Sequence, residues 1–252
     1  MAVAGTLTAE QRRAALRAGL AEHGQLRLAE VAAEWDVHPM TIRRDFEQLE
    51  REGVAQRVRG GLIHVADDVF DHRRARALTG KRKIAAKLRD LVPSDAAIGI
   101  DASTTVHLLA AEIPADQGIS VVTNGLAAFA SLHAQPGIRT FLTGGEREER
   151  NNSLVGPIAV SVVRQFLLAR CFLSAAALDP KAGTSETTIE QTAVKQAMAE
   201  VSEHVVVAVD ASKLGQRSLV RSIGLAQIDL LVTDLAPDDA RLDPYRDFVD
   251  IR

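Results

Sequence analysis

The chain has 252 residues, of which 46% are hydrophobic and 25% are charged, and its formal net charge is −3. This composition is typical of a folded globular protein and excludes a fully disordered chain. The single cysteine, Cys171, excludes an internal disulfide framework and a multi-cysteine zinc site. Because the sequence has no long apolar stretch and no secretory signal pattern, we expect a cytoplasmic protein with no membrane partner.

The charge is distributed unevenly along the chain. Residues 1–65 carry equal numbers of acidic and basic side chains, residues 66–89 carry 8 basic and 3 acidic ones, and residues 90–252 are acidic. Because nucleic acid is polyanionic, a nucleic-acid contact is expected in the first third of the chain. For the basic stretch itself, solvated charge in a linker is the alternative to a DNA contact.

Residues 1–65 are predicted to form a small domain of three helices followed by a hairpin. Thr8 and Gln11 fit the capping-box pattern that opens a helix, and this helix stops at Gly24. A second short helix follows. Pro39 suits the first position of the third helix, where its missing N–H group has no intrahelical partner to lose.

The third helix has one apolar stripe, formed by Ile42, Phe46 and Leu49. If this stripe is buried, the side chains that face outward are Thr41, Arg43, Arg44, Glu47 and Gln48. Such a surface suits a helix that enters the major groove of DNA. The alternative is a solvated surface in which the two arginines pair with Asp45 and Glu47.

Two short strands around Gly60-Gly61 predict a hairpin. The hairpin carries Arg57 and Arg59, so it can act as a wing that contacts the DNA backbone or the minor groove. The predicted DNA-contacting residues are Thr41, Arg43, Arg44, Gln48, Arg57, Arg59 and Gly60.

The Thr-Ile-Arg-Arg-Asp run at 41–45 and the Arg-Val-Arg-Gly-Gly run at 57–61 are similar to the winged helix-turn-helix of the DeoR family of bacterial repressors. The resemblance implies that double-stranded operator DNA is a partner. His38 stands where the family usually has a serine, which would cap the recognition helix.

Residues 66–80 show little periodicity and are predicted to be a linker, and residues 81–252 are predicted to form a second domain. Strand-like runs lie at 97–101, 119–123, 138–143, 170–175, 204–210 and 228–234. Helical patterns lie at 103–112, 124–134, 154–169 and 186–202. This alternation predicts an α/β fold with a Rossmann-like, largely parallel sheet that is covered on both faces.

Small polar segments follow four of the predicted strands, at 101–105, 123–125, 143–146 and 210–213. In open parallel sheets, ligands bind at the edge where such segments meet. Hydroxyl and N–H groups at a helix N-terminus can form an anion site, and Asp101 can accept hydrogen bonds from a polyol. The alternative for residues 101–105 is a helix cap with no ligand.

Residues 80–235 are similar to the sensor domain of the DeoR family, whose fold is similar to that of ribose-5-phosphate isomerase. The resemblance implies that Lys213 meets a sugar phosphate, and that Lys195 is the family's helix lysine. Gln191 stands where an acid usually precedes that lysine, with Glu190 beside it. The predicted effector-binding residues are Asp101, Ser103, Thr104, Thr105, Thr123, Asn124, Gly144, Gly145, Asn152, Ser153, Lys195, Asp210 and Lys213.

We therefore predict a transcriptional regulator, a repressor of a carbohydrate catabolic operon, which responds to a phosphorylated sugar. A homodimer or homotetramer is expected, because one small reader makes few base contacts. The alternative is an isomerase-like enzyme with an accessory DNA-binding domain. Residues 174–177 carry no acid for proton transfer, so we expect no catalytic residue. The seven histidines show no metal-ligand spacing, so we expect no metal, and we expect no cofactor.

Overall fold

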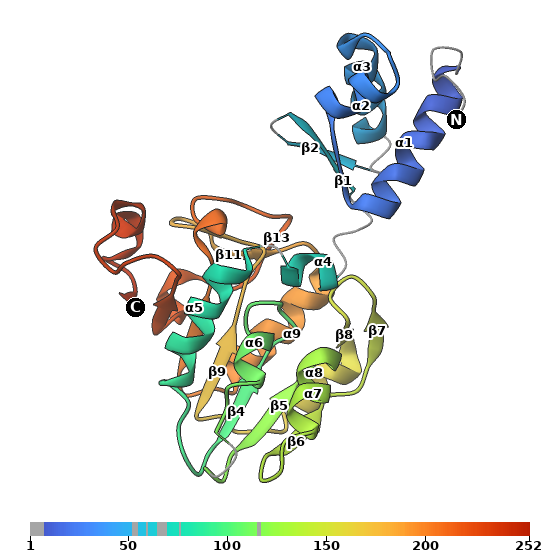
Figure 1. Ribbon diagram of the computed structural model, residues 1–252. Coiled ribbons are helices and arrows are strands. Elements are labelled where there is room, and N and C mark those ends of the chain that lie inside the picture. The colour runs from blue at the N-terminus through green and yellow to red at the C-terminus, as the bar shows by residue number, and fades with distance from the viewer. Residues whose placement is uncertain (1–7, 52–54, 59, 65–69, 76, 115–116) are drawn as a thin grey trace. The chain divides into compact units, whose positions relative to one another are not determined.

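The computed structural model describes residues 8–51, 55–58, 60–64, 70–75, 77–114 and 117–252 (Figure 1). The chain divides into two compact units, Met1–His72 and Arg73–Arg252, and each is described by itself. The division falls inside the segment 66–80 that the sequence assigns to a linker. Part of this segment is helical, because α4 (Phe70–Ala75) crosses the division.

The first unit combines helices with a small antiparallel sheet. Its elements are α1 (Ala9–His23), β1 (Gln25–Arg27), α2 (Leu28–Glu34), α3 (Pro39–Arg51), β2 (Ala55–Val58) and β3 (Gly61–His64). The strand order is β1-β3-β2. The three predicted helices and the hairpin are confirmed, and the structure adds β1 as a third strand.

Local capping explains where the helices begin and end. Thr8 and Gln11 form the predicted capping box, in which the Thr8 hydroxyl accepts the Gln11 N–H at 3.3 Å and the Gln11 side chain accepts the Thr8 N–H at 3.0 Å. Gly24 ends α1 in the left-handed conformation, with φ 71°. At the start of α3, the His38 Nδ1 accepts the Met40 N–H at 3.2 Å. A histidine ring therefore supplies the cap that a serine would otherwise provide.

The second unit is built on a seven-stranded sheet of order β15-β14-β12-β9-β4-β5-β6, in which every pair of neighbours is parallel. Its strands are β4 (Ala97–Ile100), β5 (Ser120–Thr123), β6 (Arg139–Leu142), β9 (Arg170–Leu173), β12 (Val205–Ala208), β14 (Leu230–Val232) and β15 (Asp250–Ile251). The chain runs outward from β4 in one direction and from β9 in the other. The carboxyl ends of β4 and β9 therefore flank the switch point where such sheets bind ligands.

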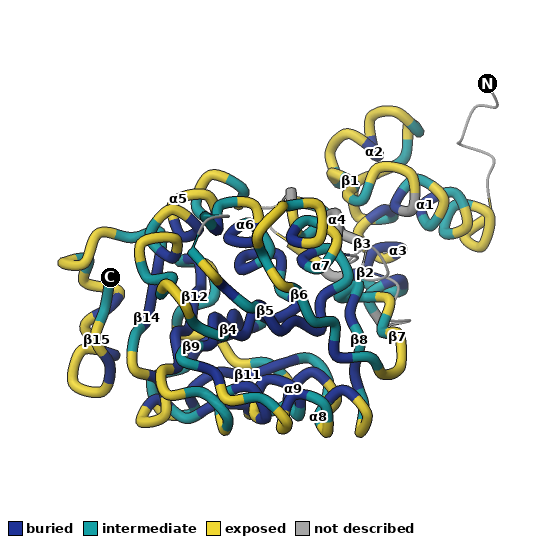
Figure 2. Tube along the Cα trace, turned by 90° about the horizontal axis from the view of Figure 1, so that it is seen from below, coloured by how far each residue is buried: buried dark blue, intermediate teal, exposed yellow. Residues whose placement is uncertain are grey.

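Helices cover both faces of this sheet (Figure 2). One face packs against α5 (Leu78–Arg89), α6 (His107–Ala110) and α7 (Leu126–His133), and the other against α8 (Pro157–Val163) and α9 (Ile189–Glu200). Side chains alternate along each strand, so Phe172 packs in the core on the α5–α7 face, while Cys171 and Leu173 pack in the core on the α8–α9 face. The predicted α/β fold with a covered parallel sheet is confirmed.

Several smaller elements were not predicted. They are the β7 (Glu146–Glu148) and β8 (Ser153–Val155) hairpin, the antiparallel sheet of β10 (Ala177–Asp179), β11 (Gly183–Glu186) and β13 (Val220–Arg221), and the 3-10 helices η2 (Ala211–Lys213), η3 (Leu225–Gln227) and η4 (Ala240–Tyr245). The helices predicted at 154–169 and 186–202 begin later than expected, because β8 and β11 occupy their first residues.

The helix predicted at 103–112 is reduced to the single turn of α6. The Ser103 hydroxyl accepts the Val106 N–H at 3.1 Å, and the Ser103 N–H is taken by Asp101, so the residues after β4 form a turn before the helix starts. Across the described part of the chain, no helix has the length and apolar character needed to cross a membrane.

Candidate functional site

The exposed face of α3 is the candidate DNA-reading surface. Ile42, Phe46 and Leu49 are buried in the core of the first unit, as the sequence predicts. Arg43 and Arg44 are consequently exposed. Thr41 and Gln48 are partly buried on the same helix. The spacing of the apolar stripe thus determines which side chains of α3 face away from the core.

Asp45 has a structural role that the sequence did not indicate. Its side chain is buried, and its carboxylate accepts a hydrogen bond from the Arg12 Nε at 2.8 Å, with the Arg13 guanidinium at 3.7 Å. Both arginines belong to α1. The part of the alternative in which Asp45 pairs with Arg43 and Arg44 is therefore wrong, since this carboxylate joins α1 to the recognition helix. The other part holds for Arg43, whose Nε lies 3.7 Å from Glu47.

The wing is tied to α3 by an ion-pair cluster. The Arg57 side chain lies 2.8 Å from the Glu50 carboxylate and 3.1 Å from that of Glu47, and the Arg43 Nε lies 3.7 Å from Glu47. The Arg57 side chain therefore faces α3. Within the described residues, Arg44 makes no ion pair.

A hollow of about 480 Å³ lies between α3 and the wing. It is lined by Leu28, Arg43, Phe46, Arg57, Val58, Gly60 and Gly61. Gly60 has φ 86°, and Gly61 lies so close to the Leu26 backbone that a β-carbon would not fit there. The predicted contact Arg59 lies outside the described residues.

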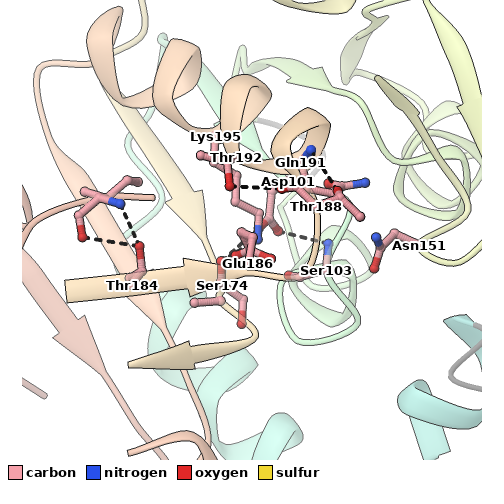
Figure 3. A network of polar contacts seen from close by, with 12 residues as sticks. Asp101, Ser103, Asn151, Ser174, Thr184, Glu186, Thr188, Gln191, Thr192 and Lys195 are labelled. Atoms are coloured by element: carbon pink, nitrogen blue, oxygen red, sulfur yellow. Dashed lines mark hydrogen bonds and ion pairs between the residues drawn. The ribbon is translucent and has the colours of Figure 1, made fainter. Parts of the chain in front are cut away.

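At the edge of the large sheet, Asp101 joins the ends of β4 and β9 (Figure 3). Its carboxylate accepts the Ser103 N–H at 3.0 Å and the Ser174 N–H at 2.8 Å. The Asp101 side chain is fully buried. In this structure its oxygens bind the protein itself, so Asp101 fixes the geometry of the switch point.

Lys195 reaches from α9 into the same place (Figure 3). Its ammonium group donates to Glu186 at 2.6 Å and to the Ser174 carbonyl at 2.6 Å, and lies 3.2 Å from Asp101. Burial opposes its charge, but Glu186 and Asp101 outweigh that effect and raise the pKa of Lys195. Lys195 is therefore a firmly charged cation held between two carboxylates.

Lys213 supplies a second cation at this edge. Its ammonium group donates to the Ala175 carbonyl at 2.6 Å. Burial lowers the pKa of Lys213, the Asp210 carboxylate counteracts this in part, and the charge on Lys195 lowers it further. The Asp210 carboxylate also accepts the N–H and hydroxyl groups of Ser212, so it shapes the turn that carries Lys213. An anion near Lys213 would offset the unfavourable burial of its charge.

Three buried polar atoms at the carboxyl ends of adjacent strands have no hydrogen-bond partner among the described residues. They are the Thr105 hydroxyl after β4, the Asn124 side-chain carbonyl after β5 and the Ser174 hydroxyl after β9. Buried polar groups are normally satisfied, so each exception requires an explanation. A polar ligand at the switch point would supply the missing partners.

Other predicted residues at this edge hold the chain in place. The Thr123 hydroxyl accepts the Gly125 N–H at 3.0 Å, and the Asn124 amide donates to the Leu154 carbonyl at 3.0 Å. Thr104 is also buried. The Asn124 contact binds the end of β5 to the β7–β8 hairpin.

Several predicted effector-binding residues lie on the β7–β8 hairpin or just before it. Gly144 and Gly145 have positive φ, and a β-carbon at Gly145 would lie 2.5 Å from the Val155 carbonyl oxygen. Asn152 adopts φ 49° at the turn, and its carbonyl accepts the Leu126 N–H. The close approach at Gly145 explains why a residue without a side chain stands there.

Two carboxylates that sequence reasoning missed organise the site. Glu186 takes the place of the expected acid beside Lys195, and Glu148 accepts hydrogen bonds from Ser153 and Gln191 at 3.1 and 2.8 Å. Both lie on strands whose polar sequences have no alternating hydrophobic pattern, so no local signal could have found them. Within the described parts of the chain, no group of His, Cys, Asp or Glu side chains could hold a metal ion.

The winged recognition helix and the buried polar site on a parallel sheet define a DNA-binding regulator with a ligand-sensing unit. Residues 12–67 match the DeoR-like helix-turn-helix domain, and residues 76–235 match the DeoR C terminal sensor domain. The chain therefore belongs to the DeoR family of transcriptional regulators.

Individual relatives agree with this assignment. The chain is 33% identical to the HTH-type transcriptional regulator GlpR of Haloferax volcanii over 198 residues, which is 77% of each chain. It is 27% identical to the glycerol-3-phosphate regulon repressor of Escherichia coli, over 86% of this chain and 87% of the relative. Among solved structures, ribose 5 phosphate isomerase A of Neisseria gonorrhoeae aligns at 19% identity with a TM-score of 0.35, over 53% of this chain and 52% of that one.

Proposed function

We propose that this regulator is a repressor whose affinity for operator DNA changes when a phosphorylated sugar or polyol binds at the switch point between β4 and β9. The unsatisfied buried polar atoms of Thr105, Asn124 and Ser174 carry this proposal. They follow β4, β5 and β9, and the two lysines donate to the carbonyls of Ser174 and Ala175 just after β9. Hydroxyl groups of a ligand would satisfy those atoms, and a phosphate would complement the cations.

On the DNA side, Arg43 and Arg44 are placed to contact base edges or phosphates from α3, and Thr41 and Gln48 flank them on that helix. Gly60 allows the wing to turn sharply. Arg57 must leave Glu47 and Glu50 before it can bind a DNA phosphate, so that contact requires the loss of both ion pairs.

On the effector side, Lys213 is the proposed phosphate contact, because it is the less strongly paired of the two lysines. Ser103 and Thr104 offer backbone and hydroxyl groups in the same turn as Thr105, while Asn152 and Ser153 border the site from the β7–β8 hairpin. One relative is named a glycerol-3-phosphate regulon repressor. Short polyol phosphates therefore belong among the candidate ligands beside pentose and hexose phosphates.

The site is better suited to binding than to catalysis. Interconversion of aldoses and ketoses requires a carboxylate base that is free to take a proton. Asp101 and Glu186 are carboxylates that the fold supplies there, but both are buried and lie 3.2 and 2.6 Å from the Lys195 ammonium group. We therefore propose a regulator without isomerase activity, and purified protein that turns over ribose 5-phosphate would contradict this.

The regulatory mechanism we propose is a population shift between states that bind operator DNA well and poorly. The effector must bind one state more tightly than the other, since equal affinity would change nothing. We also propose a homodimer or homotetramer on repeated half-sites in the cytoplasm, where operator DNA is available.

Isothermal titration calorimetry with pentose, hexose and glycerol phosphates tests the effector site. One compound should bind wild-type protein, and Lys213→Gln should weaken its binding at least about tenfold, because a charge-assisted contact is lost. Lys181→Gln, a change at an exposed lysine, serves as the matched control and should bind normally. Equal binding by both variants would refute the assignment of Lys213, and no binding by wild type would refute the proposed ligand class.

A further inference from the structure

Arg73 is the first residue of the second unit, and it is anchored at both ends. Its guanidinium group donates to the Asn151 side-chain oxygen at 2.5 Å and to the Arg150 carbonyl at 3.1 Å. Its own carbonyl accepts a hydrogen bond from the ammonium group of Lys81, which is buried. Because Arg73 lies on α4, which crosses the division at His72, these contacts hold the start of the second unit onto the β7–β8 turn and α5.

The contact with Asn151 continues into the interior of the second unit. The Asn151 N–H and side-chain amide both donate to the Glu148 carboxylate, at 3.1 and 2.7 Å. The same Glu148 oxygen accepts the Ser153 hydroxyl and the Gln191 amide, and Gln191 also donates to Ser153 at 2.7 Å. One carboxylate oxygen therefore connects α4, the hairpin and the start of α9.

This connection leads to the proposed effector site. Gln191 precedes Lys195 by one helical turn on α9, and Lys195 contacts Glu186, Asp101 and the Ser174 carbonyl. Arg73 is also near enough to Lys213 for its charge to lower the pKa of that lysine. Arg73 is thus linked to the site in two ways, through hydrogen bonds that reach Gln191 on α9 and through the effect of its charge on Lys213.

We propose that Arg73 couples the effector site to the DNA-binding unit, through its bridge to Asn151 and Glu148. This role rests on the function proposed above, and it adds the residue that transmits the response. An anionic ligand beside Lys213 attracts the Arg73 guanidinium and changes how strongly it holds the 150–151 turn. Because α4 crosses the division between the units, a change in that bridge alters the order of α4.

The first test needs no effector. Hydrogen exchange of the amides in 70–75 is compared between wild type and Asn151→Ala, which removes the side-chain acceptor for the Arg73 guanidinium and leaves the Arg150 carbonyl in place. If the bridge orders α4, exchange should be about tenfold faster in the variant, as expected for the loss of a charge-assisted hydrogen bond. Equal exchange in the two proteins would overturn the proposal, whether or not any sugar phosphate binds.

The second test measures coupling as the ratio of operator affinities with and without the sugar phosphate that binds wild type by calorimetry. Asn151→Ala and Arg73→Gln should bind operator DNA like wild type in the absence of ligand, but their ratio should fall toward one. Arg74→Gln removes the same charge from the neighbouring position of α4 and should keep the wild-type ratio.

The outcomes separate the two proposals. A wild-type ratio in both Asn151→Ala and Arg73→Gln would overturn the role of Arg73 while the effector assignment stands. If no compound binds wild-type protein, the proposed function fails, and faster exchange in Asn151→Ala would still support the bridge as the element that orders α4.

Discussion

At the scale of single residues, three of the buried carboxylates pair with a cation on another element. Asp45 joins α3 to α1 through Arg12, and Asp101 and Glu186 hold Lys195 between β4, β11 and α9. Removing one partner of such a pair leaves the other buried and poorly satisfied, which destabilises more than the pair itself stabilises. These residues are therefore expected to set the stability of their own unit.

Asp45→Asn should destabilise the first unit by about 1.5–3 kcal/mol, the usual worth of a hydrogen bond to a charged group. Urea unfolding followed by the fluorescence of Trp35, the only tryptophan of the chain, measures this unit alone. Glu30→Gln is the control, since Glu30 pairs with Arg27 on the solvent-exposed surface. This variant should lose less than about 0.5 kcal/mol of unfolding free energy. Similar losses in both variants would contradict a structural role for Asp45.

The lowered pKa of Lys213 predicts a pH dependence of effector binding. Burial holds this pKa below 10.5, and a bound phosphate would raise it again. Binding should therefore take up protons, and affinity should fall as the pH rises through the lowered pKa. Calorimetry above about pH 7.5, where a phosphate monoester is already a dianion, measures this. Lys213→Arg should bind with much less dependence on pH, and an unchanged profile would assign the titration to another group.

At the scale of elements, long apolar patterns could be predicted and short polar ones could not. All six predicted strands of the large sheet are present, because parallel strands buried on both faces read as continuous apolar runs. β15, the hairpin β7–β8 and the sheet β10-β11-β13 have strands of two to four residues with no apolar run, and β13 and β15 also pair with distant chain segments. Their absence from the prediction is why Glu148 and Glu186 were missed.

The proposed site also has a part that could be predicted from the sequence and a part that could not. Asp101, Lys195 and Lys213 could be placed at one sheet edge from sequence, because strand ends and a family resemblance identify them. Their partners could not, since the Asp101–Ser174 contact spans 73 residues and the Lys195–Glu186 pair depends on an unpredicted strand. Sequence patterns therefore indicate where polar groups gather, whereas the network among them depends on the tertiary fold.

Gly80 on α5 illustrates how packing overrides helix propensity. A β-carbon there would lie 2.6 Å from the Asp234 carboxylate, whose other oxygen already accepts the Ala211 N–H at 2.8 Å. Gly80→Ala should therefore destabilise the second unit by about 1–3 kcal/mol.

Gly19 on α1 supplies the contrast, since a β-carbon there meets Leu26 at an ordinary 3.5 Å. Gly19→Ala should stabilise the first unit by about 0.5–1 kcal/mol. The two variants are compared by urea unfolding, with Trp35 fluorescence for the first unit and Cys171 labelling for the second. A gain of stability in Gly80→Ala would show that Asp234 can move aside.

At the scale of the whole molecule, each unit has its own apolar core and its own spectroscopic or chemical reporter. Trp35 borders the core of the first unit, and Cys171 is fully buried in the second, where burial raises the pKa of its thiol to about 12. Cys171 should therefore react with a thiol reagent only when the second unit unfolds. Asp45→Asn should shift the Trp35 transition and leave the labelling transition unchanged, and a shift of both would show that the units unfold together.

The central claim is that one chain reads operator DNA and responds to a phosphorylated sugar. The most direct test is fluorescence anisotropy on DNA from upstream of its own gene, with and without each sugar phosphate. Wild-type protein should bind, one compound should change its affinity by at least about fivefold, as expected for an allosteric effector, and Arg44→Ala should weaken binding by about 1–3 kcal/mol. DNA binding that none of these compounds alters would contradict the assignment of the second unit as a sugar-phosphate sensor.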